Sequence, residues 1–263
     1  MERIASRQNP LVRRFRALAT DGAASGAVLL DGAHLLDEAL RSRVPVEIVA
    51  VADRHNPEHD PLLEAARDAG ARIIHVADPV LDAISPVRQP SGVVAIATLA
   101  PSSLDACLAE RPALAIVLAG VQDAGNVGAA IRAAEGCGAT GVICTDATAD
   151  PFGWKALRGA MGSTFRLPVA LERDLSSVVD RLRRAGIAVL ATVPRDGTPL
   201  RATDLRQPCA VLLGAEGSGL SPDAERQADA SLTIPMRPPV ESLNVAIAAA
   251  LILFEASRQR EAR

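Results

Sequence analysis

The chain has 263 residues, a length typical of one or two domains. Hydrophobic residues make up 49% of it and charged residues 22%, which excludes an intrinsically disordered chain. Aromatic residues are only 2%, so stacking on aromatic side chains is excluded as the main means of holding a nucleic acid. The net charge of −3 excludes a globally basic surface, and any nucleic-acid surface must therefore be local.

The N-terminal region predicts a short amphipathic helix. Pro10 directly follows a polar residue, as is common at helix starts, and apolar residues then recur at near-helical spacing up to Leu18. The remaining positions of this region are rich in arginine. Two interpretations stay open for them, a solvated face or a contact with the RNA backbone. The candidate RNA-binding residues are Arg7, Arg13, Arg14 and Arg16.

Strands then alternate with helices, which predicts an α/β domain over residues 1–97. The expected strands are Ala27–Leu30, Val46–Val51, Arg72–Val76 and Val93–Leu99. The expected helices are Asp31–Arg41, Pro61–Ala69 and Pro79–Ile84. A Pro- and Ser-containing stretch follows, and we interpret residues 98–112 as a linker.

The same alternation predicts a second α/β domain over residues 113–263, with a mostly parallel sheet. Its expected strands are Leu114–Leu118, Gly141–Cys144, Ala188–Thr192, Ala210–Leu213 and Leu232–Ile234. Its expected helices are Ala129–Ala134, Lys155–Met161, Leu175–Ala185 and Asn244–Gln259.

Nothing in the sequence indicates export or a membrane. The N-terminus has no apolar core of a signal peptide, and the longest apolar run, Val245–Phe254, is far shorter than the roughly 20 residues of a spanning helix. No two of the four cysteines form a Cys-x-x-Cys pair, as expected of free thiols in a reducing compartment. We therefore expect a cytoplasmic protein with no membrane partner.

One segment, His55 to His59, has the His-x-x-Glu-His pattern of some zinc proteases. That pattern works only on a helix, and Pro57 in its middle would break one. We therefore expect no metal site.

Two glycine-rich segments, Val121–Arg132 and Leu213–Leu220, each follow a predicted strand directly. Neither has the glycine spacing of a dinucleotide fingerprint or a P-loop, which disfavours a dinucleotide-dependent oxidoreductase. Glycines at the carboxyl ends of strands still let the backbone approach a ligand. A third segment runs from Ile234 into the last helix; taken alone, Ser242 or Asn244 reads as a helix cap.

Together these three segments resemble the motifs of the SpoU/TrmH-type RNA 2'-O-ribose methyltransferases of the SPOUT superfamily. The matching stretches are Gly125–Ala134, Leu213–Leu220, Ile234–Met236 and Ser242–Ala246. Residues 155–168 resemble the segment between the motifs. More loosely, Ser6–Pro10 and Leu30–His34 resemble the N-terminal substrate-binding domain, with Asp31 where glutamate is usual.

The resemblance implies a knotted C-terminal SPOUT methyltransferase domain and a smaller N-terminal α/β substrate-binding domain. It implies that S-adenosylmethionine binds in a deep trefoil knot, held by the backbone around Gly214, Ile234 and Leu243. Ile234 and Leu243 would offer an apolar wall to the adenine. The family acts as homodimers with sites near the interface, and the helix from Val245 to Phe254 is a candidate part of that interface.

The resemblance also implies the roles of the polar residues. Arg132 corresponds to the catalytic arginine, and two roles are open for it, gripping the RNA phosphate or acting transiently as a base. The residues expected to orient the ribose, the arginine and the cofactor are Asn126, Glu216, Ser242 and Asn244. The methyl group of the cofactor is already activated, so the enzyme must mainly align it with the ribose 2'-oxygen.

The expected substrate is ribosomal RNA, because a separate N-terminal domain is common in the members of the family that act on it. One alternative is a tRNA 2'-O-methyltransferase. Another is a non-catalytic RNA-binding relative, against which the retention of Asn126, Arg132, Glu216 and Asn244 argues.

Overall fold

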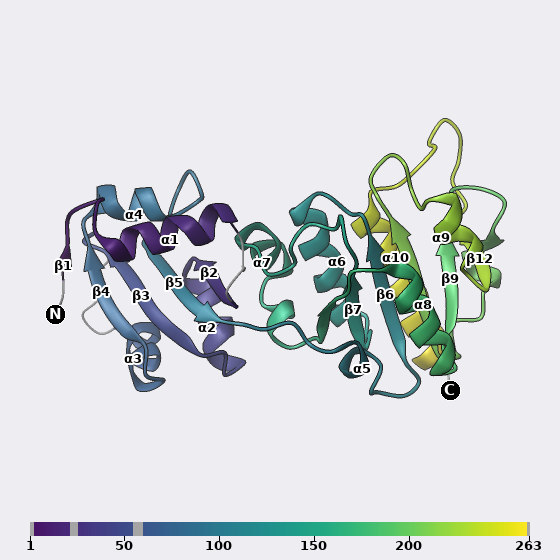
Figure 1. Cartoon of the computed structure of the whole chain (residues 1–263), viewed down its shortest axis with the longest axis horizontal. Coiled ribbons are helices and arrows are strands. Elements are labelled where there is room, and N and C mark those ends of the chain that lie inside the picture. The colour runs from purple at the N-terminus through teal and green to yellow at the C-terminus, as the bar shows by residue number, and fades with distance from the viewer. Residues whose placement is uncertain (1–2, 22–25, 55–59, 262–263) are drawn as a thin grey trace. The chain divides into compact units, whose positions relative to one another are not determined.

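Two β-sheets organise the chain, and each lies in its own unit (Figure 1). The structure is a computed structural model that describes residues 3–21, 26–54 and 60–261. Unit 1 comprises residues 1–100 and 152–165, and unit 2 comprises residues 101–151 and 166–263. Residues 152–165 thus group with unit 1, although they lie within the range 113–263 that the sequence assigns to the methyltransferase domain.

Unit 1 holds a five-stranded sheet in the order β1-β4-β3-β5-β2. Its strands are β1 (Arg3–Ile4), β2 (Ala27–Asp31), β3 (Val46–Ala52), β4 (Arg72–Val76) and β5 (Val93–Thr98). Strands β1, β4 and β3 are parallel, whereas β5 runs antiparallel to β3 and β2. Its first four helices are α1 (Pro10–Asp21), α2 (Ala33–Arg41), α3 (Pro61–Asp68) and α4 (Asp78–Ile84).

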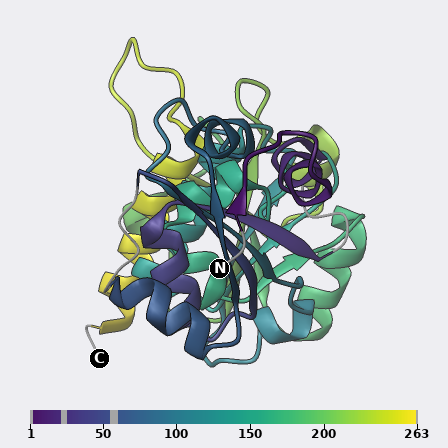
Figure 2. The same cartoon turned by 90° about the vertical axis from the view of Figure 1, so that its left-hand side faces the viewer.

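Helices cover both faces of this sheet, with α1 and α4 on one side and α2 and α3 on the other (Figures 1 and 2). Val12, Phe15 and Leu18 of α1 are buried in one hydrophobic cluster with residues of α4 and of strands β2 to β5. The apolar stripe of α1 therefore faces the sheet, which leaves its arginines on the outer side.

The segment 152–165 carries helix α7 (Trp154–Ala160) and the short 3-10 helix η1 (Ser163–Phe165). Trp154 packs against the cluster under α1, and an Arg158 Nη1 atom lies 3.7 Å from Oδ1 of the buried Asp31. Ser85 Oγ donates a 2.5 Å hydrogen bond to Oδ2 of the same carboxylate. Burial raises the pKa of Asp31, while Ser85 and Arg158 act in the opposite direction. Two segments noted in the sequence, around Asp31 and Arg158, thus meet within unit 1.

Unit 2 holds a seven-stranded sheet in the order β10-β12-β9-β11-β6-β7-β8. Every pairing in it is parallel, which confirms the predicted parallel sheet. Its strands are β6 (Leu114–Ala119), β7 (Gly141–Cys144), β8 (Val169–Leu171), β9 (Ala188–Thr192), β10 (Thr198–Pro199), β11 (Cys209–Gly214) and β12 (Ala230–Thr233). Its helices are α5 (Leu104–Cys107), α6 (Ala124–Gly136), α8 (Leu175–Arg184), α9 (Pro222–Arg226) and α10 (Val245–Glu261), with the short 3-10 helix η2 (Leu200–Ala202).

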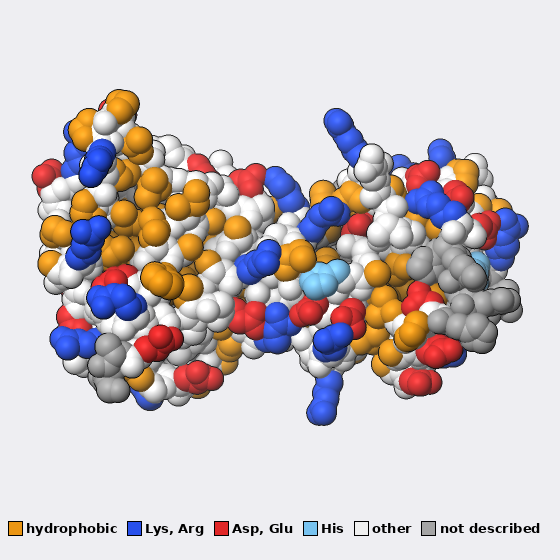
Figure 3. All heavy atoms as spheres, turned by 180° about the vertical axis from the view of Figure 1, so that it is seen from behind, with side chains coloured by type: hydrophobic (Ala, Val, Ile, Leu, Met, Phe, Trp, Pro, Cys, Tyr) orange, Lys and Arg blue, Asp and Glu red, His pale blue; other side chains and the backbone are white. Residues whose placement is uncertain are grey.

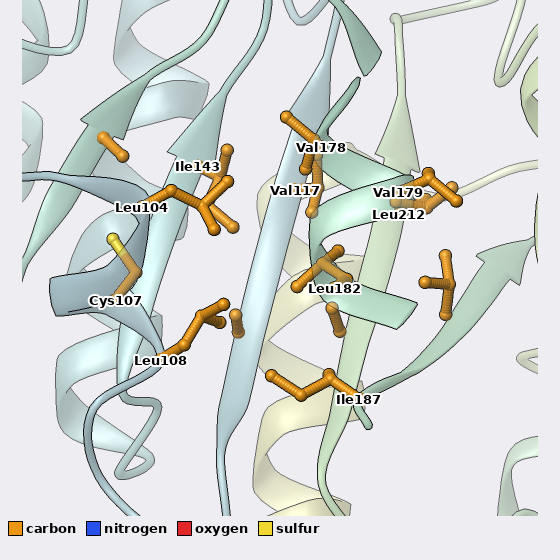
Figure 4. Close-up of a cluster of buried hydrophobic side chains, with 14 of the residues drawn as sticks. Leu104, Cys107, Leu108, Val117, Ile143, Val178, Val179, Leu182, Ile187 and Leu212 are labelled. Atoms are coloured by element: carbon orange, nitrogen blue, oxygen red, sulfur yellow. The ribbon is translucent and has the colours of Figure 1, made fainter. Parts of the chain in front are cut away.

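One core cluster of unit 2 packs α5, α8 and α9 against a single face of the sheet (Figure 4). Helices α6 and α10 pack against each other, and both contact strands of the sheet. Leu104 and Cys107 of α5 are buried in the cluster, so the stretch expected to be a linker contributes to this core. Ser103 starts α5, because its Oγ accepts a hydrogen bond from the backbone N–H of Ala106.

Helix α6 begins earlier than the sequence predicts, at Ala124 rather than at Ala129. The Asp123 carboxylate caps it by accepting a 2.9 Å hydrogen bond from the backbone N–H of Asn126. Gly125 and Gly128 consequently lie in the first turns of the helix and not in a loop. The predicted start was wrong because the two glycines weaken the helical pattern of the first turns. They hid the correct start signal, which is the capping aspartate.

Candidate active site

A pocket of about 580 Å³ lies at the carboxyl ends of β9, β11 and β12, all within unit 2. It is formed by residues 192–194 after β9, residues 213–220 after β11, and residues of the long loop between β12 and α10. That last loop projects from the sheet in both ribbon views (Figures 1 and 2). Open parallel sheets bind their ligands at this end.

The pocket brings together most of the predicted site residues. The lining includes Gly214, Ile234 and Leu243, proposed for the cofactor, and Glu216, Ser242 and Asn244, proposed for orientation. These residues come from segments far apart in the chain, so their meeting is a property of the fold and not of sequence proximity.

Gly214 is required by a close approach of the chain to itself. A Cβ atom at this position would lie 2.1 Å from the carbonyl carbon of Gly219 and 2.2 Å from the nitrogen of Leu220. Ala215 and Gly219 exchange two backbone hydrogen bonds that hold the loop in this turn, and Gly219 adopts a φ of +68°. The absence of a side chain at Gly214 thus admits the returning loop that forms the pocket wall. The contact of its backbone with a cofactor stays a prediction.

Asn126 joins the site from α6 through two directed hydrogen bonds. Its Nδ2 donates to Glu216 Oε1 at 2.8 Å, and its Oδ1 accepts from Asn244 Nδ2 at 2.9 Å. A carboxylate can only accept, so the Asn126 amide must turn its NH₂ group toward Glu216 and its oxygen toward Asn244. The three side chains therefore form a relay with one possible direction of donation.

Glu216 also fixes the start of α6. Its Oε2 accepts from the backbone N–H of Gln122 at 3.0 Å, and its Oε1 accepts from that of Asp123 at 3.4 Å. Burial raises the pKa of Glu216, but the hydrogen bonds from Asn126 and from these backbone amides outweigh it and lower the pKa overall. Glu216 is thus a carboxylate at neutral pH, as the relay requires.

Asn244 is both a helix cap and a member of the relay. Its Oδ1 accepts from the backbone N–H groups of Ala246 and Ile247, which leaves its Nδ2 for Asn126. The two interpretations of this residue from the sequence are therefore compatible. Ser242 lines the same pocket, but its side chain makes no hydrogen bond within the described part of the chain.

Arg132 is exposed on α6 and does not line the pocket. At 3.6 residues per turn, it lies about 120° around the helix from Asn126. Among the described residues it has no ion-pair partner. The side chain is therefore available to a molecule outside this chain.

The sequence missed some residues that line the pocket. Glu241 lines the pocket, and the sequence analysis gave it no role. Its position directly before the motif Ser242–Ala246 could have indicated that it belongs to the site. Glu225 and residues 192–194 also line the pocket, and no local pattern marks them. Residues 192–194 are found only through the strand order, which places β9 beside β11, and Glu225 reaches the pocket from α9.

Comparison with known proteins gives the family. Residues 113–254, more than half of the chain, match the SpoU rRNA Methylase family. The chain belongs to this family. Residues 9–95 match the MRM3-like substrate binding domain. The predicted activity class, an S-adenosylmethionine-dependent RNA methyltransferase, and the predicted two-part α/β architecture are thereby confirmed.

Similar proteins span almost the whole length of this SpoU-family chain. RlmP of Bacillus subtilis, named as a 23S rRNA (guanosine(2553)-2'-O)-methyltransferase, is 30% identical over 97% of this chain and 98% of its own. RlmB of Ralstonia nicotianae, named as a 23S rRNA (guanosine-2'-O-)-methyltransferase, is 34% identical over 90% and 97%. The structure of AviRb from Streptomyces viridochromogenes in complex with AdoMet matches with a TM-score of 0.88 and 28% identity, covering 97% of this chain and 99% of that one.

The predicted RNA-binding arginines of this SpoU-family chain have different surroundings. Arg14 pairs with Glu47 through both ends of its guanidinium, and Arg7 donates to the carbonyl of Pro79. Arg13 and Arg16 are exposed on the outer face of α1 and have no ion pair within the described residues. Arg14 is therefore a weaker candidate than the sequence indicates, because its charge is already matched.

We expect the double substitution Arg13→Ala and Arg16→Ala to weaken RNA binding and to flatten its salt dependence. Each lost phosphate contact should reduce the slope of log K against log salt by about 0.7 to 0.9. Arg14→Ala is the matched control on the same helix and should change the slope less. Filter binding of ribosomal RNA fragments over a salt series measures both, and equal slopes for all variants would show that α1 is only a solvated face.

The remaining sequence observations concern a metal site and a membrane span. The His55–His59 segment lies outside the described residues. No cluster of three or more potential metal-ligating side chains occurs in the described ranges. Within those ranges no helix is long and apolar enough to cross a membrane.

Proposed function

We propose that this chain transfers the methyl group of S-adenosylmethionine to a ribose 2'-hydroxyl of 23S ribosomal RNA in the cytoplasm, with the cofactor in the pocket between β9, β11 and β12. The relay from Asn244 through Asn126 to Glu216 carries this proposal, because it joins the three sequence motifs at the edge of one pocket. Full-length relatives named for 23S rRNA 2'-O-methylation support the choice of reaction.

The residues present fit the cofactor. The backbone of the loop after β11 is open along a glycine-rich turn, and Leu232, Ile234 and Leu243 supply an apolar wall that suits adenine. S-adenosylmethionine brings an already activated methyl group. What remains for the protein is to hold the RNA ribose beside it and to assist loss of the hydroxyl proton.

The relay is suited to positioning. Glu216 holds the loop before α6, and Asn126 is fixed between the carboxylate and the amide of Asn244. These hydrogen bonds give the three side chains defined orientations before RNA arrives. Arg132 supplies the positive charge, either to an RNA phosphate or to the 2'-oxygen as its proton leaves.

Ribosomal RNA is favoured over tRNA by how much of the chain each kind of relative matches. A solved structure from a study of C/U34 2'-OH methylation on tRNA matches with a TM-score of 0.53 and covers only 58% of this chain. AdoMet-bound rRNA methyltransferase from Sinorhizobium meliloti covers 98% with a TM-score of 0.85. We assign residues 1–97 to RNA binding and 113–263 to methyl transfer, although residues 152–165 group with unit 1. The stretch 98–112 joins the two, and its helix α5 belongs to the core of unit 2.

We further propose that unit 2 forms the family's trefoil knot and a homodimer through α10. Ile247, Leu251 and Phe254 lie on one side of this helix and are 53%, 42% and 66% exposed, whereas its opposite side is buried. Hydrophobic side chains gather on this face of unit 2 (Figure 3). An apolar stripe of this kind on a surface helix is typical of a protein interface.

The dimer proposal predicts that Phe254→Asp halves the mass of the particle in solution. A charge on an apolar interface is costly to bury, and Phe254 is too exposed to matter for the fold of one chain. Light scattering after gel filtration measures the mass. Ser177→Asp, at an exposed position of α8, is a control for charge away from α10. A monomeric mass for the unmodified chain would contradict the proposal.

The proposed activity is tested by methyl transfer from labelled S-adenosylmethionine to ribosomal RNA and tRNA taken from cells that lack the enzyme. We expect label in 23S rRNA. Alkali cannot cleave the bond next to a 2'-O-methyl ribose, so the label should remain in dinucleotides after hydrolysis. Label released in mononucleotides would indicate a base methylation and contradict the proposal.

A further inference from the structure

The cofactor pocket has an unbalanced negative charge. Among the described residues that line it, Glu216, Glu225 and Glu241 are acidic, and there is no lysine, arginine or histidine. The Glu216 carboxylate already accepts hydrogen bonds from the Asn126 amide and from two backbone N–H groups. Glu225 and Glu241 have no ion pair with any described residue. Two carboxylates in the pocket are therefore left for a ligand.

The two forms of the cofactor differ by one positive charge. S-adenosylmethionine carries a sulfonium, whereas S-adenosylhomocysteine carries a neutral thioether, because the sulfur keeps the electron pair of the broken S–CH₃ bond. The amino-acid end and the adenosine are the same in both. A negative pocket without a compensating base must therefore favour the methylated form over the demethylated one.

On the basis of the proposed cofactor site, we infer that Glu225 and Glu241 make the pocket selective for the charged cofactor over its demethylated product. They are specificity-determining residues and take no part in proton transfer. Glu225 comes from α9 and Glu241 from the loop before α10, so the two residues line the pocket from different segments. Both are exposed, and solvent screening limits the effect of each.

Binding of three ligands to the full-length chain tests the inference by calorimetry. The ligands are S-adenosylmethionine, S-adenosylhomocysteine and sinefungin, in which a protonated amine replaces the charged methylsulfonium. For the double substitution Glu225→Gln and Glu241→Gln, we expect a loss of about fivefold in affinity for the two cations. The affinity for S-adenosylhomocysteine should change by less than about twofold on the same reasoning.

Two further variants make the outcomes separable. Glu110→Gln removes the same charge before β6, at the opposite end of the sheet, and should alter no affinity. Ala248→Phe fills the pocket from α10 and should abolish binding of all three ligands, with its unfolding temperature as a check on the fold.

Equal changes for the three ligands in the double variant, or no change in any, would overturn the inference, while the loss in Ala248→Phe would leave the cofactor site standing. If Ala248→Phe binds all three ligands normally, the proposed cofactor site is wrong, and the inference falls with it. A selective loss for the two cations supports both.

Discussion

Arg132→Ala is expected to lower the rate of methyl transfer by about 100-fold or more, the usual range for loss of a group that assists proton transfer or stabilises charge. The fold should be unaffected, because Arg132 is exposed and has no ion pair within the described residues. Cofactor binding should also be unchanged, because this residue does not line the pocket. Arg132→Lys should restore little activity, since a compact ammonium does not replace a planar fork of donors.

The two possible roles of Arg132 separate in single-turnover assays at rising RNA concentration. A group that acts in the transition state lowers the rate even at saturation. A group that only anchors the RNA raises the concentration needed, and full recovery at saturation would refute the catalytic role.

For the dimer proposed above, a mixed dimer would show where Arg132 acts. Pairing an Arg132→Ala chain with an Asn126→Asp chain regenerates one intact site only if the arginine serves the pocket of the second copy. Activity in the mixed dimer, with none in either parent, would place Arg132 there. Inactivity would place it at its own pocket.

Asn126→Asp is expected to be at least as harmful as Asn126→Ala, with a loss of about 100-fold in activity from misplacement of the site. The aspartate can still accept from Asn244, but it sets a second carboxylate against Glu216 at the 2.8 Å contact. The pKa of Glu216 should rise as a result, because a like charge disfavours its ionised form. Partial recovery of Asn126→Asp at lower pH, where one of the two carboxylates takes up a proton, is a further expected result.

A compensating substitution tests the direction of the relay. In the double variant Asn126→Asp and Glu216→Gln, the new amide at position 216 would donate to the new carboxylate at position 126, so this hydrogen bond would run in the reverse direction. The oxygen of the new amide could still accept from the backbone N–H of Gln122. The longer 3.4 Å hydrogen bond from the backbone N–H of Asp123 would be lost, because its acceptor is the atom that becomes the NH₂ group. We expect this variant to recover part of the activity that Asn126→Asp loses. Additive losses in a double-mutant cycle would contradict the relay.

The motifs of the candidate site could be predicted from the sequence, but their spatial relations could not. Asn126, Glu216 and Asn244 were found as separate matches, and no periodicity shows that their amides and carboxylate bond to one another. The direction of that relay follows from Asn244, whose oxygen is occupied by the backbone of α10. The sequence indicated that Asn244 could cap the helix. It did not indicate that capping leaves the Asn244 NH₂ group to donate to Asn126.

The strand pattern predicted most elements of the fold, and the errors have local causes. Helix α6 was placed too late because its first turns contain two glycines, and α5 was missed because four residues give no helical period. The grouping of residues 152–165 with unit 1 depends on Trp154 and on the contact of Arg158 with Asp31, both tertiary contacts. The ion pair of Arg14 with Glu47 is also a tertiary contact, because Glu47 lies on a strand far along the chain.

The most direct test of the account is a map of ribose methylation across 23S rRNA, 16S rRNA and tRNA in a strain that lacks this gene. We predict that one 2'-O-methyl group is lost from 23S rRNA, that the unmodified gene restores it, and that the Arg132→Ala and Asn126→Asp versions do not. An unchanged map, or a loss confined to tRNA, would contradict the account.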